Sequence, residues 1–186
     1  FAILRAYEEI HEMLSVNFPE INPPLETQGI FRFENIEFLG YMARLSLYPV
    51  TGDDFKVEEI VFPPHKIYIH GTLFDEDLRN KYFSGNYSMI PYTNHFNEFY
   101  GNVTDLIEYQ YENGSNRNLL IIGSSFRNAL DPLLASHYDH TYCVDLRYNT
   151  TFSLSDFLNT HKIDDILIVG DNVVAFEDVE YWEIHP

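Results

Sequence analysis

The sequence lacks several features that would assign it to a particular class of protein. It holds a single cysteine, Cys143, so the chain cannot form a disulfide within itself and requires no oxidising compartment. No apolar run approaches the roughly 20 residues that span a bilayer, and no signal peptide is visible. Because the chain starts at Phe1 rather than at a methionine, we expect it to be a piece of a longer protein, with any targeting signal upstream.

Basic residues are scarce as well. Lys and Arg number 11 against 29 Asp and Glu, which gives a net charge of −18. A field of this sign repels phosphate backbones and anionic lipid head groups, so we expect no nucleic-acid partner. Neutral sugars, cations and basic surfaces remain as partners. Apolar residues make up 45% of the 186 residues, enough for a sizeable core, and we expect residues 1–186 to form a single domain.

The first two thirds of the chain alternate short apolar runs with turn residues. Apolar residues at helical spacing predict an amphipathic helix over residues 3–14, which the following prolines end. The runs 57–61 (VEEIV) and 66–70 (KIYIH) are typical of short strands. The run 36–50 (IEFLGYMARLSLYPV) fits a helix or a strand, and its pattern does not decide between them.

Tyrosines are frequent between residues 82 and 111. Such amphipathic rings suit the rim of a sugar-binding site, but they also cover ordinary cores. The sequence leaves both interpretations open.

The last third of the chain is more regular. Apolar runs at 118–122, 141–146 and 165–170 predict buried strands, and helical spacing within 125–137 and 154–161 predicts helices between them. Strands that alternate with helices form parallel βαβ units, with helices on both faces of the sheet. We therefore predict an α/β fold in which these three runs are parallel strands.

Polar residues follow each of these strands. Sites in parallel sheets lie just beyond the carboxyl ends of the strands, where neighbouring ends converge. We therefore predict one site formed by three clusters: Gly123-Ser124-Ser125, Asp145-Leu146-Arg147-Tyr148 and Gly170-Asp171-Asn172.

Ser125 has two interpretations. At a strand-to-helix turn its hydroxyl would lie among free backbone N–H groups that can stabilise an oxyanion, as a nucleophile requires. Alternatively, Ser124 or Ser125 only caps the helix, because Gly-Ser-Ser before a helix is a common pattern.

Arg147 also has two interpretations. Asp145 can hold the guanidinium so that it binds a carboxylate or a sugar oxygen, or the two residues form an internal ion pair that fixes the loop. We expect no metal or other cofactor, because His137 and His140 have no third and fourth ligand at a suitable spacing and no phosphate-binding loop is present.

Residues 119–148 (LLIIGSSFRNALDPLLASHYDHTYCVDLRY) resemble the core block of the DHHW family of SGNH-hydrolase-like proteins. In that family an apolar strand precedes Gly-Asp-Ser-Tyr/Phe, a helix ends in Pro-x-Leu, and a strand ends in Asp-x-Arg-Tyr. The segments YEEIHEML, FLGYMAR and NEFYGNVTDLIEYQYENGSN resemble the flanking blocks in the same order. The family is related to proteins that acetylate alginate and other exported polysaccharides. The resemblance implies a three-layer α/β/α, flavodoxin-like fold and an extracytoplasmic or cell-envelope location.

Ser125 matches the nucleophile of that family by position, and Arg147 and Tyr148 match residues that line its pocket. We assign substrate binding to five polar residues: Ser124, Asn128, Arg147, Tyr148 and Asn172.

Two departures from the family pattern bear on activity. Ser124 replaces the aspartate beside the nucleophile, and the Asp-His-His-Trp motif, which supplies the base and its orienting carboxylate, is not in this chain. In the family this motif precedes the first helix. A serine is a weak nucleophile without an adjacent base, so we expect the isolated chain to be inactive or nearly so.

Three functions fit these observations. The first is an esterase or O-acetyltransferase acting on cell-surface carbohydrate: Ser125 attacks an acyl ester, Asn128 adds a polar contact, and an upstream histidine takes the proton. The second is a catalytically degenerate module that binds glycan or an envelope protein without turnover. The third is a structural module of a larger surface protein. We expect any membrane tether to lie outside this chain.

Overall fold

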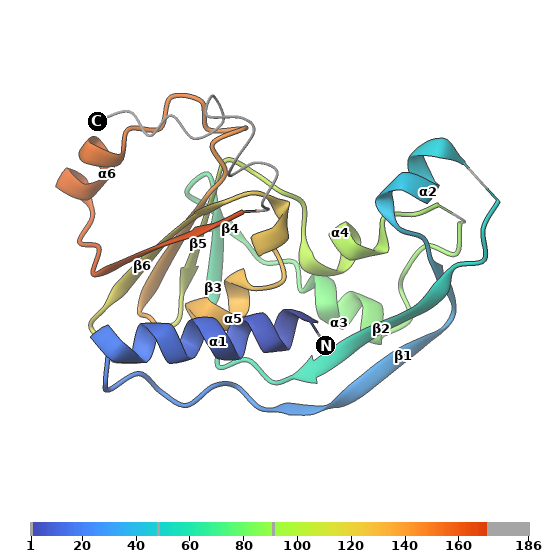
Figure 1. The fold of residues 1–186 in the computed structure, drawn as a ribbon, viewed down its shortest axis with the longest axis horizontal. Coiled ribbons are helices and arrows are strands. Elements are labelled where there is room, and N and C mark those ends of the chain that lie inside the picture. Colours follow the sequence, from blue (N-terminus) through green and yellow to red (C-terminus); the bar gives the residue numbers. More distant parts are fainter. Residues whose placement is uncertain (1, 48, 91, 171–186) are drawn as a thin grey trace. The chain divides into compact units, whose positions relative to one another are not determined.

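The computed structural model describes residues 2–47, 49–90 and 92–170 (Figure 1). The chain divides into two compact units. Three segments build the first, which we call the sheet unit: Phe1–Pro24, Phe62–Asp75 and Val103–Pro186. Two segments build the second, the ribbon unit: Leu25–Val61 and Glu76–Asn102. That residues 1–186 form a single domain stays a prediction.

The sheet unit is built around a six-stranded sheet with the strand order β4-β3-β5-β7-β6-β8. The strands are β3 (Lys66–Ile69), β4 (Thr72–Phe74), β5 (Leu106–Gln110), β6 (Asn118–Gly123), β7 (His140–Val144) and β8 (Asp165–Val169). The helices are α1 (Ala2–Asn17), α5 (Asp131–Ala135), α6 (Leu154–Thr160) and the 3-10 helix η1 (Ser125–Arg127).

Strands β7, β6 and β8 are parallel, as the apolar runs of the last third predicted. The four residues Leu119–Ile122 at the centre of β6 are 0% exposed, as expected for a strand covered on both faces. Helix α6 begins where predicted, and the Ser153 side chain caps it by accepting the N–H of Asp156. The predicted α/β class is confirmed.

Strands β5, β3 and β4 complete the sheet in antiparallel orientation. Strand β3 corresponds to the strand predicted at 66–70. The sheet is therefore mixed, with its parallel half in the last third of the chain. Because Leu106 of β5 pairs with Val144 of β7, the residue before β5, Asp105, lies at the edge where the parallel strands end.

Helices cover both faces of the sheet. On one face the ring of Tyr142 in β7 packs against Phe157 of α6, with ring centroids 5.2 Å apart. The next residue, Cys143, points to the opposite face, where Asp131 of α5 lies close enough to act on its thiol. The layers are therefore helix, sheet and helix.

Helix α1 lies against α5 and the residues that follow it (Figure 1). The hydroxyl of Tyr7 and Nε2 of His137 are 2.7 Å apart, and both side chains are buried. The His11 ring stands edge-on to the His137 ring at 4.7 Å, and its Nε2 is hydrogen-bonded to the Asn22 carbonyl. Two imidazoles thus form part of the contact between α1 and the rest of the unit.

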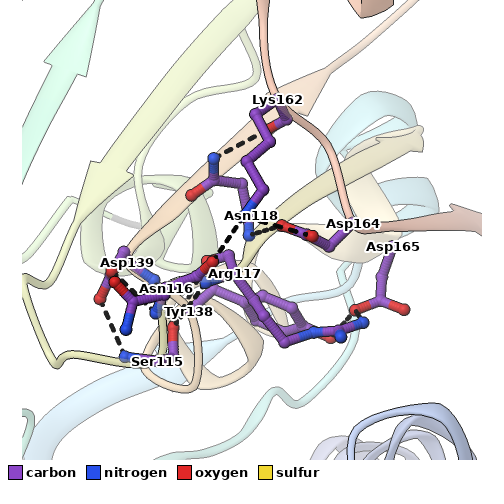
Figure 2. Close-up of polar contacts among 9 residues, drawn as sticks. All are labelled: Ser115, Asn116, Arg117, Asn118, Tyr138, Asp139, Lys162, Asp164 and Asp165. Carbon is purple, nitrogen blue, oxygen red and sulfur yellow. Dashed lines mark hydrogen bonds and ion pairs between the residues drawn. The ribbon is translucent and has the colours of Figure 1, made fainter.

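A polar network closes the amino ends of the parallel strands (Figure 2). The Asp139 carboxylate accepts the backbone N–H groups of residues 114–116 at 2.8–3.2 Å. At the start of β8, the Asp165 carboxylate accepts from Arg117 Nη2 at 2.7 Å and from the Tyr138 hydroxyl at 3.0 Å. These contacts fix the loops at the edge opposite to the predicted site.

The ribbon unit has its own strands, helices and core. Its elements are β1 (Thr27–Phe38), α2 (Tyr41–Ser46), β2 (Asp53–Ile60), α3 (Leu78–Phe83) and α4 (His95–Tyr100). Strands β1 and β2 form an antiparallel ribbon, and aromatic side chains dominate its core: Phe33, Ile36, Phe55, Val57, Tyr82 and Phe99. The undecided run 36–50 is both a strand and a helix, because β1 ends within it and α2 follows.

None of the helices within residues 2–47, 49–90 and 92–170 has the length and apolar character that a bilayer span requires.

Candidate active site at the carboxyl edge of the sheet

The carboxyl ends of β6, β7 and β8 lie in line. Ile122 of β6 pairs with Val144 of β7 on one side and with Ile168 of β8 on the other. The Gly-Ser-Ser turn and the Asp145 loop therefore leave the sheet at the same edge. Asp171 and Asn172 lie outside the described residues, so the contribution of Asn172 stays a prediction.

Gly123 ends β6 at a point of close backbone approach. A Cβ at this position would lie 2.4 Å from the Val169 carbonyl oxygen and 3.3 Å from Cδ of Arg127. Only glycine leaves room for β8 here. The turn that carries the serines thus starts directly against the neighbouring strand.

The chain after this turn differs from the continuous helix predicted over 125–137. It forms the 3-10 helix η1 and then the separate helix α5. Pro132 lies in the first turn of α5, where its missing N–H is tolerated; inside a longer helix its ring would clash with the preceding turn. The prediction of one helix was wrong because it relied on the apolar spacing and gave too little weight to Pro132.

The two serines of the turn have different surroundings. Ser124 is 6% exposed, and its hydroxyl has no hydrogen-bond partner among the described residues. Ser125 is partly exposed, and within the described chain its hydroxyl likewise makes no hydrogen bond. Ser124 occupies the N-cap of η1 but forms no side-chain cap. Ser124 therefore does not make the hydrogen bond between its hydroxyl and a helix N–H that the capping interpretation requires. The Ser125 hydroxyl is available to react.

Beneath the turn lies a buried ion pair that the sequence analysis missed. Arg127 and Asp131 have side chains 0% and 1% exposed, and Nη1 of Arg127 contacts Oδ2 of Asp131. Nε of Arg127 donates to the Gly123 carbonyl at 3.3 Å. Burial raises the pKa of Asp131 to about 6, against the opposing effect of the guanidinium. The available signal was an Arg and an Asp four residues apart in an otherwise apolar stretch.

Asn128 is 4% exposed, so it lies inside the unit rather than on its surface. Its backbone N–H donates to the Ser125 carbonyl at 3.3 Å, which extends the 3-10 turn. Its assignment to substrate binding stays a prediction.

Of the two interpretations of Arg147, the structure shows the internal ion pair with Asp145. Its backbone N–H and Nε donate to Oδ1 of Asp145 at 3.0 Å, and its Nη2 donates to Oδ2 at 2.6 Å. Asp145 is 1% exposed, whereas the Arg147 side chain is 37% exposed and lies 5.7 Å from the ring centre of the exposed Tyr148. The loop is therefore fixed by Asp145, and ligand binding by Arg147 and Tyr148 stays a prediction.

Two histidines of the sheet unit, His140 and His70, lie away from Ser125. His140 begins β7, at the far edge of the sheet, and is hydrogen-bonded to Glu108. His70 follows β3 at the near edge, with Nδ1 2.7 Å from Oδ1 of Asp105. Its strand is three positions from β6 in the sheet, which corresponds to about 14 Å at the usual strand spacing. Within the described part of this unit, no histidine hydrogen-bonds Ser125.

Three further features bear on binding: metal ligands, the tyrosines of residues 82–111 and a surface hollow. The described residues contain no group of three or more His, Cys, Asp or Glu that could hold a metal ion. Several tyrosines of the 82–111 segment are core residues, with Tyr82, Tyr109 and Tyr111 between 1% and 6% exposed. A surface hollow of about 420 Å³ lies in the ribbon unit, beside the exposed Arg32–Asp54 ion pair.

Comparison with known proteins extends these observations. No protein-family model matches the chain, and no curated protein matches it in sequence. Among solved structures, PatB1 of Bacillus cereus with a sulfonyl adduct is similar at a TM-score of 0.68 and 16% identity, over 99% of this chain and 60% of PatB1. A second structure of PatB1 is similar at a TM-score of 0.62 and 16% identity, over 95% and 60%.

A DHHW family protein from Eubacterium siraeum is similar at a TM-score of 0.65 and 21% identity, over 93% of this chain and 56% of that protein. The chain thus spans less than two thirds of the length of either protein. Its fold is that of PatB1 and of a DHHW family protein, which confirms at the level of fold the resemblance found in its sequence.

Proposed function

We propose that this chain carries the nucleophile of an SGNH-hydrolase-like esterase or O-acetyltransferase that acts on carbohydrate at the cell envelope. The observation that carries the proposal is the position of Ser125. It stands at a strand-to-helix turn on the carboxyl edge of the sheet, partly exposed, with its hydroxyl unbonded within the described residues.

The backbone around Ser125 offers hydrogen-bond donors for the carbonyl oxygen of an acyl substrate. The first N–H groups of a helical turn have no intrahelical partner, and in η1 these belong to Ser125 and Phe126. Such donors stabilise the oxygen that becomes negative when a carbonyl is attacked. Fixed backbone donors need no reorganisation during the reaction.

The reaction follows from these groups. Oγ of Ser125 bonds to the acyl carbon while a base takes its proton, and the alcohol leaves with a proton returned by that base. Water or a sugar hydroxyl then attacks the acyl group on Ser125, which gives hydrolysis or transfer respectively. We infer that the base is a histidine outside the described residues, as the family resemblance implies.

The alternative function is a degenerate module that binds glycan or an envelope protein without turnover. Ser124 favours it, because the family has a carboxylate at this position. The ion pair between Arg147 and Asp145 is weaker support for this alternative, since the Arg147 side chain remains 37% exposed. The tyrosines that suggested a sugar-binding rim lend it little support where they are buried in the core.

Covalent labelling distinguishes the two functions. We expect phenylmethanesulfonyl fluoride to label the complete gene product on Ser125: Oγ bonds to sulfur, fluoride leaves, and the base takes the proton. Mass spectrometry of peptides would place the adduct. Ser125→Ala should remove it, whereas Ser155→Ala, a control at an exposed serine of α6, should retain it. A complete gene product that remains unlabelled at Ser125 would support the binding module.

A further inference from the structure

The buried Arg127–Asp131 pair has no role in the steps above. Its two side chains are 0% and 1% exposed, so both charges are removed from water. Removing an ion pair from water costs several kcal/mol per ion, and apolar residues of similar volume often stabilise a fold equally well. Nη2 of Arg127 also has no hydrogen-bond partner among the described residues, which adds to this cost. Stability alone therefore does not account for the pair.

The pair connects to the candidate active site through the backbone of the turn. Nε of Arg127 donates to the Gly123 carbonyl at 3.3 Å, and the Cδ of the same side chain lies directly under Gly123. The peptide that follows this carbonyl carries Ser124, and the next residue is Ser125. The orientation of the Gly123 peptide thus sets the direction in which the turn leaves the sheet.

We propose that Arg127, held by Asp131, is a positioning residue that fixes the Gly123 peptide and thereby the direction of the Ser125 hydroxyl. This inference rests on the proposed function of Ser125. It does not place Arg127 in contact with the substrate, because the side chain is fully buried. Displacement of a reacting group by about 1 Å can slow a reaction roughly a hundredfold, so loss of this restraint should appear in the reactivity of Ser125.

A double substitution separates positioning from stability. We expect Arg127→Met combined with Asp131→Leu to keep the melting temperature of the complete gene product at or above that of the wild type, because apolar residues replace a buried pair. The rate of labelling of Ser125 by phenylmethanesulfonyl fluoride should fall about tenfold or more. Labelling of a folded double variant at the wild-type rate would overturn the inference.

Single lysine substitutions provide a matched control. Arg127→Lys keeps the charge but loses the planar guanidinium. Arg117→Lys makes the same change in the Arg117–Asp165 pair at the opposite edge of the sheet (Figure 2). Both should lower the melting temperature, but only Arg127→Lys should slow the labelling of Ser125. Equal labelling rates in the two folded variants would contradict a positioning role.

The pH dependence of the Ser125 labelling rate is a further test. If the pair were purely structural, the charge of Asp131 would not affect this rate in the folded protein. Because burial raises the pKa of Asp131 to about 6, its carboxylate is charged at pH 7 and neutral at pH 5. Asp131→Asn mimics the neutral form at every pH. The ratio of wild-type to Asp131→Asn labelling rates should therefore fall toward one as the pH drops below 6, and a ratio of one at pH 7.5 would overturn the inference. Absence of Ser125 labelling in the wild type would instead remove the proposed function itself.

Discussion

Gly123 is the residue at which the sheet leaves no room for a side chain. A Cβ there would lie 2.4 Å from the Val169 oxygen, which is backbone of the adjacent strand and cannot rotate away. We expect Gly123→Ala to lower the free energy of unfolding by about 1–3 kcal/mol, as overpacking usually does. Urea denaturation followed by circular dichroism measures the change.

Gly40→Ala is the control for that measurement. A Cβ at Gly40 meets nothing within 4 Å, so its effect should stay below about 1 kcal/mol. An unchanged midpoint for Gly123→Ala would mean that β6 and β8 do not approach as closely as the structure shows.

At the scale of single residues, the sequence predicted the place of the candidate site but not the buried ion pair that lies beneath it. Ser125 and Asp145 were identified because they follow apolar runs, and strand ends in parallel sheets converge. The Arg127–Asp131 pair was missed because sequence patterns assign charged residues to the surface. That Arg127 lies beneath the turn depends on how α5 packs on the sheet, which no local pattern contains.

Among the elements, α1 contacts the rest of the sheet unit through the buried side chain of His137, whose imidazole is hydrogen-bonded to Tyr7. Burial lowers the pKa of His137 to about 4, and the nearby His11 adds to the effect. Histidine in an unfolded chain titrates near 6.5, so the unfolded state binds a proton first as the pH falls. Stability is therefore lost between about pH 6.5 and pH 4, and the shift corresponds to about 3 kcal/mol.

We expect His137→Gln to remove most of this pH dependence. Glutamine retains a polar group for the Tyr7 hydroxyl but has no proton to gain in this range. The measurement compares the free energy of unfolding at pH 7 and at pH 4 in variant and wild type. His65→Gln, in an exposed loop, controls for the loss of a histidine as such. If the free energy of unfolding of His137→Gln changes with pH as much as that of the wild type, His137 is not the source of the pH dependence.

The elements also show where sequence patterns stop being informative. The parallel strands of the last third were predictable because they are short, apolar and separated by helices. The antiparallel strand β5 was not, because its five residues, LIEYQ, are too few to show a clear pattern and its partners lie far along the chain. Pairing between distant segments is set by the whole fold rather than by local composition.

At the scale of the whole molecule, the proposal places the nucleophile, Ser125, in this chain and its base outside the described residues. We expect residues 1–186 alone to show little or no esterase activity on small acetyl esters, since general base catalysis contributes about 10²–10⁴-fold. The complete gene product should be active, and Ser125→Ala should abolish its activity. Hydrolysis of 4-nitrophenyl acetate measures both.

Strong, Ser125-dependent turnover by residues 1–186 alone would contradict this prediction. The base would then be a histidine within the chain, and the His70–Asp105 pair at the same edge of the sheet would be the first to test. His140 would not be, because it lies at the opposite edge.

The strand order has a consequence for the biosynthesis of the protein. Strand β6 lies between β7 and β8, and Gly123 finds its register partner, Val169, only at the end of the last described strand. Chains emerge from the ribosome amino end first, at about 5–20 residues per second. The turn with Ser124 and Ser125 is therefore translated before β8, and it gains its flanking strand only when β8 has left the exit tunnel. The surroundings of the candidate nucleophile are thus among the last parts of the sheet to form.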